Sequence, residues 1–228
     1  MAQATAAAPA SEARVNTFLA QVYLLMFVGL AVTGVVSLWV SESLRFQYAL
    51  FNNAWLGWGL FLLQIIVVAF LSARIMSLSP GAAALLFLFY AALVGVSISS
   101  IFLVYAQEQI ASVFLLTSGT FLISGLVGLL IKRDMSGAGN FLFMLLTGWA
   151  LAWFLSWLFP WSNFGWALNY IGIAIFVGLT AWDTQQLKKI GQQIGSHPAR
   201  GGLVVIGALK LYLDYINLFL LMLRASRR

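Results

Sequence analysis

The hydrophobic residues of this chain gather in seven long segments, and short, more polar connections separate them. Each segment reaches the ~20 residues that an α-helix needs to cross the hydrocarbon core of a bilayer. Backbone groups in lipid must be satisfied within the protein, so these spans are expected to be helices, and the ~10-residue alternating strands of a membrane barrel are not evident. The pattern predicts an all-α membrane protein, a seven-transmembrane-helix bundle, with spans at about 18–40, 54–78, 81–105, 110–131, 140–159, 165–187 and 202–223.

The parts of the chain outside these spans are short. Residues 1–17 are rich in alanine and lack apolar periodicity, so we expect a disordered cytoplasmic arm and not a signal peptide. The longest connection, 188–201, has about fourteen residues, which is too few for a soluble domain. Residues 18–228 are therefore expected to form a single domain with a short basic C-terminal tail, and any function must lie inside the bundle or on its surface.

Composition excludes several classes of protein. Hydrophobic residues make up 62% of the chain and charged residues 8%, whereas a soluble domain carries roughly 25% charged residues. The chain has no cysteine, which excludes disulfides and thiolate metal sites, and its single histidine, His197, cannot form a histidine metal cluster. The net charge is +6, but the basic residues occupy short loops and the tail without aromatic interleaving, so no nucleic-acid partner is expected.

The basic residues also predict the orientation in the membrane. The side that holds the N-terminus carries Arg14, Arg74, Lys132, Arg133, Lys188, Lys189 and Arg200, and the opposite side carries Arg45, Arg224, Arg227 and Arg228. Seven against four places the N-terminus in the cytoplasm, although the arginines of the tail argue against this orientation. The opposite interface is marked by the tryptophans that flank the first and fifth connections, namely Trp39, Trp55, Trp58, Trp157, Trp161 and Trp166.

Three ionisable residues lie inside the predicted spans: Asp183 in the sixth, and Lys210 and Asp214 in the seventh. Insertion scales assign a charge at the centre of a span a cost of roughly 2.5 to 3.5 kcal/mol. Arg74 lies near the end of the second span and is expected in the same cytoplasmic layer as Asp183. Residues of this kind within a membrane usually line a pathway or pair with one another, so they are the candidate functional residues.

Helical periodicity places Gly207, Lys210, Asp214 and Asn217 on one face of the seventh span. A polar stripe on an apolar helix is expected to face the bundle interior or a water-filled path, although Asn217 alone could simply make a helix–helix hydrogen bond. Close helix–helix contacts are expected at Gly29, Gly34, Gly95, Gly119, Gly125, Gly128, Gly172 and Gly178.

The charged residues have structural interpretations that stay open. Asp183 could be a solvated interfacial residue near Lys188, and Asp214 could be neutralised by Lys210 one turn earlier. Arg74 could extend its side chain to the lipid headgroups.

A functional interpretation treats Asp183 and Asp214 as a coupled pair. Two neighbouring carboxylates cannot both ionise cheaply, so at low pH they would share a proton and hold the last two helices together, and at higher pH their repulsion would loosen the pair. Arg74 could bridge to either carboxylate. Ionised carboxylates also bind Ca²⁺ transiently, with Asn217, backbone carbonyls or water completing its six to eight oxygen ligands.

The stretches around these residues resemble the Bax-inhibitor-1 family, also called the transmembrane Bax-inhibitor-motif family, and the similarity covers about residues 18–223. The residues that carry it are Ala181-Trp-Asp-Thr-Gln-Gln-Leu-Lys188, Gly207-Ala-Leu-Lys-Leu-Tyr-Leu-Asp-Tyr-Ile-Asn-Leu-Phe-Leu220, Leu93-Val-Gly-Val-Ser-Ile-Ser-Ser-Ile-Phe102 and Lys132-Arg-Asp-Met-Ser136.

This resemblance implies a seven-helix bundle whose last helix is surrounded by the other six. It also implies a pH-sensitive calcium leak, in which Asp183, Asp214 and Arg74 match the positions of the gate. Two of these stretches, Leu93–Phe102 and Lys132–Ser136, resemble the bacterial branch of the family and imply a bacterial inner membrane. Some bacterial relatives associate with a membrane-anchored protease. Lys210 departs from the family pattern, and because its ammonium would favour ionised Asp214 and repel an incoming cation, it is expected to modulate the leak.

Two functions follow as alternatives. One is a calcium leak channel with the bilayer, calcium ions and protons as its partners, and a membrane protease as a further candidate partner. The other is a regulatory membrane protein that modulates a membrane-anchored protease or another membrane partner without transport. An enzyme is not expected, because Leu211-Tyr-Leu precedes Asp214 where aspartyl intramembrane proteases carry Gly-x-Gly, and no histidine lies in a span to act as a base. No cofactor motif is present in the sequence.

Overall fold

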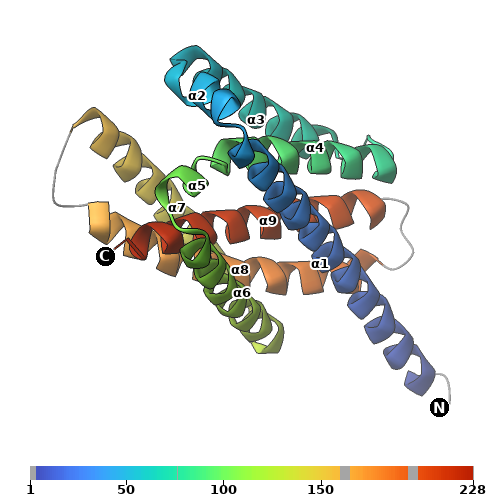
Figure 1. Ribbon diagram of the computed structural model, residues 1–228. Helices are drawn as coiled ribbons and strands as arrows, with labels where there is room; N and C mark the ends of the chain where they lie inside the picture. Colours follow the sequence, from blue (N-terminus) through green and yellow to red (C-terminus); the bar gives the residue numbers. More distant parts are fainter. Residues whose placement is uncertain (1–3, 76, 160–164, 195–199, 228) are drawn as a thin grey trace. The chain divides into compact units, whose positions relative to one another are not determined.

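The computed structural model describes residues 4–75, 77–159, 165–194 and 200–227, and within them every regular element is an α-helix (Figure 1). In chain order these helices are α1 (Ala4–Glu42), α2 (Leu44–Asn52), α3 (Ala54–Arg74), α4 (Pro80–Ile98), α5 (Ile101–Val104), α6 (Gln107–Leu130), α7 (Ser136–Leu158), α8 (Gly165–Ile194) and α9 (Arg200–Ala225).

Seven stretches of these helices are long and apolar enough to cross a membrane. They follow the order of the seven predicted segments, so the all-α, seven-span fold class is confirmed. The narrow division between the third and fourth predicted spans is also present, since α5 ends at Val104 and α6 begins at Gln107. That the last helix is surrounded by the other six stays a prediction.

The third span, Pro80–Val104, shows how local sequence shapes a helix. Ser79 caps its start, because the Ser79 Oγ accepts a hydrogen bond from the Ala82 N–H at 3.3 Å, and Pro80 occupies the first turn, where a missing N–H is harmless. The helix breaks briefly between α4 and α5, where Ser99 and Ser100 return hydrogen bonds from their hydroxyls to carbonyls of the preceding turn. Such bonds compete with regular helical bonding.

Two features differ from the sequence-based expectations. Helix α1 begins at Ala4, so residues 4–17 are helical in the structure and do not form the expected disordered arm. Alanine has the highest helix propensity, and a helix that has already formed in the adjacent span extends at little cost. The second difference is α2, a short helix that lies in the first predicted connection and was not predicted. Ser43 is the N-cap of α2, and Asn53 is the N-cap of α3.

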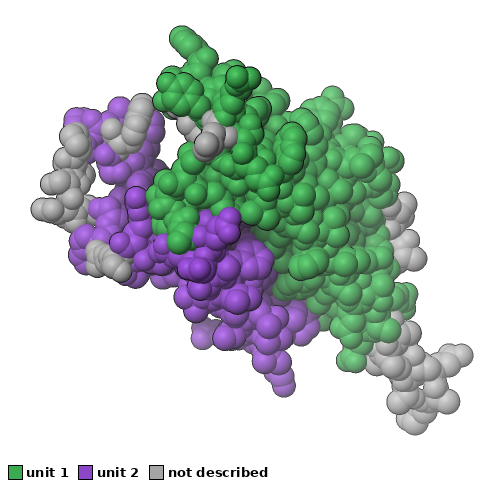
Figure 2. All heavy atoms as spheres, in the orientation of Figure 1, with its two compact units in different colours: residues 1–106, 191–212 green, residues 107–190, 213–228 purple. Residues whose placement is uncertain are grey.

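The chain divides into two compact units, coloured in Figure 2: unit 1 contains residues 1–106 and 191–212, and unit 2 contains residues 107–190 and 213–228. Helix α9 therefore contributes its first half to unit 1 and its second half to unit 2.

In unit 1, helix α1 packs along α4, and α2 contacts both α1 and α3. The two long helices approach closely at Gly95, where an added Cβ would meet the Thr33 carbonyl oxygen at 2.7 Å. The Thr33 hydroxyl donates to the Ala91 carbonyl oxygen at 2.9 Å and is also hydrogen-bonded to the Tyr212 hydroxyl at 2.7 Å. Tyr212 is fully buried, so its hydrogen bond to Thr33 fixes the first half of α9 within unit 1 from inside an otherwise apolar environment.

In unit 2, an apolar cluster joins α8 to the second half of α9. Its buried members are Ile175, Phe176, Leu179, Leu218 and Leu221. Helix α6 lies against α8 at Gly128, where a Cβ would meet the Ala181 carbonyl oxygen at 2.1 Å. The only residue small enough for this approach is glycine, so the sequence itself sets how closely these two helices pack.

Candidate proton and cation site

Helices α8 and α9, which carry the two predicted aspartates, pack against each other within unit 2. Besides the apolar cluster, the Asn169 side-chain Nδ2 donates to the Leu221 carbonyl oxygen at 2.9 Å. Gly172 lies close to the same leucine, since a Cβ there would meet Leu221 Cδ1 at 2.9 Å. The contact is therefore fixed both by apolar packing and by a buried hydrogen bond.

Asp183 lies in α8 within a run of buried polar residues. Its side chain is only 7% exposed, and Thr180, Thr184 and Gln185 are buried with it. The prediction that Asp183 is a solvated interfacial residue is not supported by this burial. The predicted neighbour, Lys188, has another partner: its Nζ donates a hydrogen bond to the Leu129 carbonyl oxygen at the end of α6, at 2.9 Å.

Asp214 lies in α9 and is 6% exposed. The next residue, Tyr215, is also buried, and its hydroxyl is hydrogen-bonded to the Ser118 hydroxyl at 2.7 Å and donates to the Phe114 carbonyl oxygen at 3.3 Å, both on α6. These bonds hold the α9 backbone beside α6 at the level of the aspartate. Two acidic side chains, Asp183 and Asp214, are thus both withdrawn from solvent on packed helices of one unit.

Asn217 is half-buried one turn after Asp214. Its Nδ2 donates to the Leu213 carbonyl oxygen of its own helix at 2.8 Å, which differs from the expected helix–helix hydrogen bond. This bond orients the amide, and the side-chain oxygen Oδ1 is the atom that would contact a cation. Among the described residues, no group of three or more histidine, cysteine, aspartate or glutamate side chains could hold a metal ion.

A set of hydrogen bonds that the sequence analysis missed lies just beyond Asp183. The side chain of Gln185 donates from Nε2 to the carbonyl oxygens of Ile131 and Arg133 at 3.0 and 2.9 Å, and its Oε1 accepts from the Met135 N–H at 3.0 Å. One buried amide therefore binds the turn between α6 and α7 at three points.

Two lysines extend this arrangement along α8. Lys188 binds the end of α6, as described above, and Lys189 forms a salt bridge with Asp134 in the α6–α7 turn. We refer to Gln185, Lys188 and Lys189 as the α8 clamp. The hydrogen bond from Lys189, together with bonds from the Ser136 hydroxyl and N–H, lowers the pKa of Asp134 to about 2.

Residues 15–226 match the family model described as "Inhibitor of apoptosis-promoting Bax1". The chain belongs to the Bax inhibitor-1 family. It is 44% identical over 215 residues to the inner membrane protein YbhL of Escherichia coli K12, an alignment that covers 93% of this chain and 92% of that protein. It is also similar to an uncharacterized protein of Borreliella burgdorferi (36% over 210 residues, 92% and 90% covered) and to an uncharacterized membrane protein of Streptococcus pyogenes serotype M3 (32% over 220 residues, 96% and 95% covered).

Membership in the Bax inhibitor-1 family confirms the resemblance that the motifs indicated.

The two other predicted site residues, Arg74 and Lys210, lie outside unit 2. Arg74 is the last residue of α3 in unit 1 and is exposed, and its proximity to the aspartates stays a prediction. Lys210 is the exposed member of the polar stripe, whereas Gly207 and Asp214 are buried, because a long lysine side chain can carry its ammonium away from an apolar helix.

The predicted aromatic belt is partly described. Trp39, Trp55, Trp58 and Trp166 are exposed, as residues at a membrane interface should be. Trp161 lies outside the described residues, as do His197 and the side chain of Trp157.

Proposed function

We propose that this member of the Bax inhibitor-1 family is a pH-sensitive calcium leak channel, gated by proton sharing between Asp183 and Asp214. The observation that supports the proposal is the burial of both carboxyl groups, 7% and 6% exposed, on two helices that pack against each other. A buried carboxylate is costly unless it is protonated, paired or bound to a cation, so a pair of them forms a natural proton switch.

Electrostatics sets the size of the switch. Two unit charges about 4 Å apart repel by roughly 4 kcal/mol at an effective dielectric constant of 20. A proton shared between two carboxylates at such a distance would remove this repulsion and add a hydrogen bond between α8 and α9. When that proton leaves at higher pH, the repulsion acts directly on the contact between the two helices, and the pair becomes a binding site for a divalent cation.

The cation is cargo and not a resident cofactor in this proposal. Two carboxylates supply fewer ligands than the six to eight oxygens that calcium prefers, so Asn217 Oδ1, backbone carbonyls and water would complete a transient shell. Weak, incomplete coordination suits conduction, which requires that an ion leave as readily as it enters. We propose no enzymatic activity.

The location and orientation also belong to the proposal. The relative YbhL is named as an inner membrane protein, and we propose the bacterial inner membrane for this chain as well. The distribution of basic residues supports an N-terminus in the cytoplasm, which would place Asp183 near the cytoplasmic side.

The test is calcium flux into dye-loaded proteoliposomes from acidic to mildly alkaline pH. Wild type should conduct more as the pH rises, and Asp183→Asn and Asp214→Asn should each change the profile, because an amide cannot exchange the proton. The matched control is Asp134→Asn, which removes the remaining aspartate of the chain, exposed and outside the spans. It should keep the wild-type profile.

Two results would contradict the proposal. One is an absence of protein-dependent flux at every pH with correctly folded wild type, which would favour the regulatory protein without transport. The other is a pH profile that both aspartate variants leave unchanged, which would separate the leak from this pair.

A further inference from the structure

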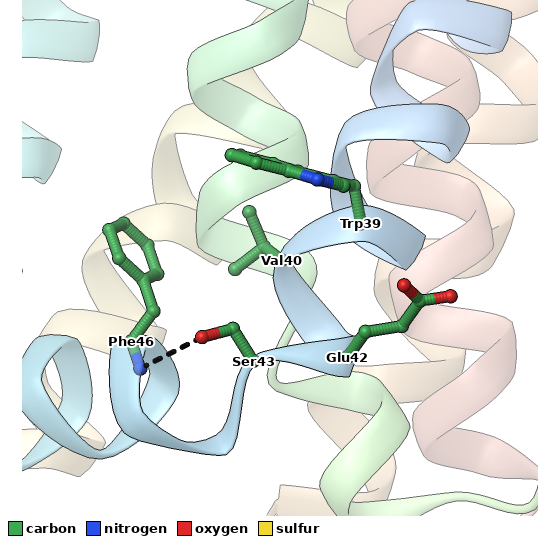
Figure 3. Close-up of a pocket in the computed structure, with 5 residues that line it drawn as sticks. All are labelled: Trp39, Val40, Glu42, Ser43 and Phe46. Atoms are coloured by element: carbon green, nitrogen blue, oxygen red, sulfur yellow. Dashed lines mark hydrogen bonds between the residues drawn. The ribbon is translucent and has the colours of Figure 1, made fainter.

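A pocket of about 370 Å³ lies where α1 ends and α2 begins, far along the sequence from the two aspartates. Trp39 and Val40 come from α1, Glu42 and Ser43 lie at the junction, and Phe46 comes from α2. In the view of Figure 3 the Trp39 indole closes the top, Phe46 and Glu42 stand on opposite sides, and the Ser43 hydroxyl lies at the base, where it accepts a hydrogen bond from the Phe46 N–H. The volume is within the range of small-ligand sites.

The lining selects the charge of a ligand. The faces of tryptophan and phenylalanine rings carry negative electrostatic potential and attract organic cations, and ammonium groups are held in this way by aromatic residues in many proteins. The Glu42 carboxylate adds a full negative charge at the same pocket. An anion would meet unfavourable charge here, whereas an ammonium group would find both kinds of partner.

The position of the pocket indicates where that ammonium comes from. The first membrane-spanning stretch, Glu12–Glu42, ends at the pocket. Exposed aromatic side chains surround this end of unit 1, with Trp39 and Tyr48 each 73% exposed and Trp55 87% exposed. Tryptophan and tyrosine gather at the depth of lipid headgroups, so the pocket opens at the level where phospholipid headgroups lie.

Helix α2 contributes the complementary charge. It turns Gln47 and Leu50 inward, where both are buried, and leaves Arg45 and Phe46 on its outer side. Arg45 does not line the pocket, but it is exposed and lies in sequence between the lining residues Ser43 and Phe46, so a positive charge directly follows the negative Glu42 along this junction. We propose that the pocket binds the zwitterionic headgroup of an ammonium-bearing phospholipid, with the ammonium between Trp39, Phe46 and Glu42 and the phosphate at Arg45.

Native mass spectrometry of the purified full chain, titrated with phosphatidylethanolamine or phosphatidylglycerol, tests this proposal. Wild type should bind phosphatidylethanolamine more tightly, and Glu42→Gln and Trp39→Leu should each weaken that binding about fivefold without weakening phosphatidylglycerol binding. Arg45→Gln should weaken both lipids, because both carry the phosphate. Glu42 is exposed, so its substitution by glutamine should leave folding intact, which thermal unfolding checks.

The chain offers matched controls at the same predicted membrane interface. Glu108→Gln and Trp166→Leu remove an exposed carboxylate and an exposed indole that do not line the pocket, and they should keep the wild-type preference. Equal binding of the two lipids by wild type, or an unchanged preference in Glu42→Gln, would overturn the proposal. Binding of free phosphoethanolamine as tight as that of the lipid would overturn the lipid as its source.

Discussion

The α8 clamp makes a prediction whose size follows from the structure. Replacing Gln185 by alanine removes two hydrogen bonds to carbonyl oxygens of the α6–α7 turn and one from the Met135 N–H. A hydrogen bond contributes about 1 kcal/mol net to stability, so three bonds contribute about 3 kcal/mol. The turn is exposed at residues 132–134, so water can replace part of the lost bonding, and we expect the free energy of unfolding to fall by about 2 kcal/mol.

The neighbouring residue supplies the control. Gln186 has the same side chain and is only half-buried, and Gln186→Ala should change stability by no more than about 0.5 kcal/mol. Thermal and denaturant unfolding of the two variants in the same detergent gives the global comparison. Hydrogen exchange gives the local one, because the Met135 amide loses its acceptor in Gln185→Ala and should exchange roughly 30-fold faster if 2 kcal/mol of protection is lost.

The reasoning fails if the two glutamine variants are equally stable. It also fails if Gln185→Ala destabilises the whole protein but leaves the exchange of the Met135 amide unchanged, because the lost stability would then come from packing and not from the turn. An intermediate result, with faster exchange at Met135 and little change in global unfolding, would mean that the turn opens separately from the rest of unit 2 and would refute the 2 kcal/mol estimate.

Three further predictions concern charge and packing. The hydrogen bond from Lys189 lowers the pKa of Asp134 to about 2. The salt bridge should therefore stabilise the α6–α7 turn above about pH 4, and this stabilisation should be lost as the pH falls from about 4 to 2. Hydrogen exchange of the turn should show this pH dependence in wild type and not in Asp134→Asn. Gly128→Ala should lower the free energy of unfolding by about 1 to 3 kcal/mol, because its Cβ would meet the Ala181 carbonyl oxygen at 2.1 Å. Gly119→Ala is the control: the space around Gly119 is open, so this variant should leave the free energy of unfolding unchanged or raise it by up to about 1 kcal/mol. In the proposed leak channel, Lys210→Ala should move the onset of calcium flux to higher pH, because the variant lacks the positive charge predicted to favour ionised Asp214. An unchanged profile and amplitude would remove Lys210 as a modulator.

The spans were predictable because the requirement that acts on them is simple. A helix that crosses a bilayer needs about 20 apolar residues, and that length is visible in any sequence. The ends of the helices were not predictable, because they depend on local chemistry. Residues 4–17 are helical because they are rich in alanine, and α2 begins at its N-cap, Ser43. The periodicity of a nine-residue helix is too short to stand out beside an apolar span.

The glycines show the same limit for packing. Gly29, Gly95, Gly128, Gly172 and Gly178 lie at close contacts as expected, but Gly34 and Gly119 have nothing within 4 Å of an added Cβ. A sequence shows where a close approach is permitted, and only the structure shows where a neighbouring helix uses it.

For the candidate site, the sequence identified the acidic residues but not what surrounds them. Asp183 and Asp214 stood out because a charge in an apolar span is costly, and both are buried. Gln185 did not stand out, because a neutral amide two residues after an aspartate has no unusual property until its partners are known. Those partners, the backbone of Ile131, Arg133 and Met135, are about fifty residues away in sequence.

Helix α9 has a mechanical consequence. Its 26 residues form one uninterrupted rod roughly 39 Å long, and the boundary between the two units falls inside it, between Tyr212 and Leu213. Tyr212 is tied through its hydroxyl to Thr33 of α1, and Asp214 is only two residues further along the same rod. Because a helical backbone is stiff over two residues, the orientation of Asp214 about the helix axis is closely tied to that of Tyr212. The buried bond between the Tyr212 and Thr33 hydroxyls therefore fixes which face of α9 the aspartate occupies.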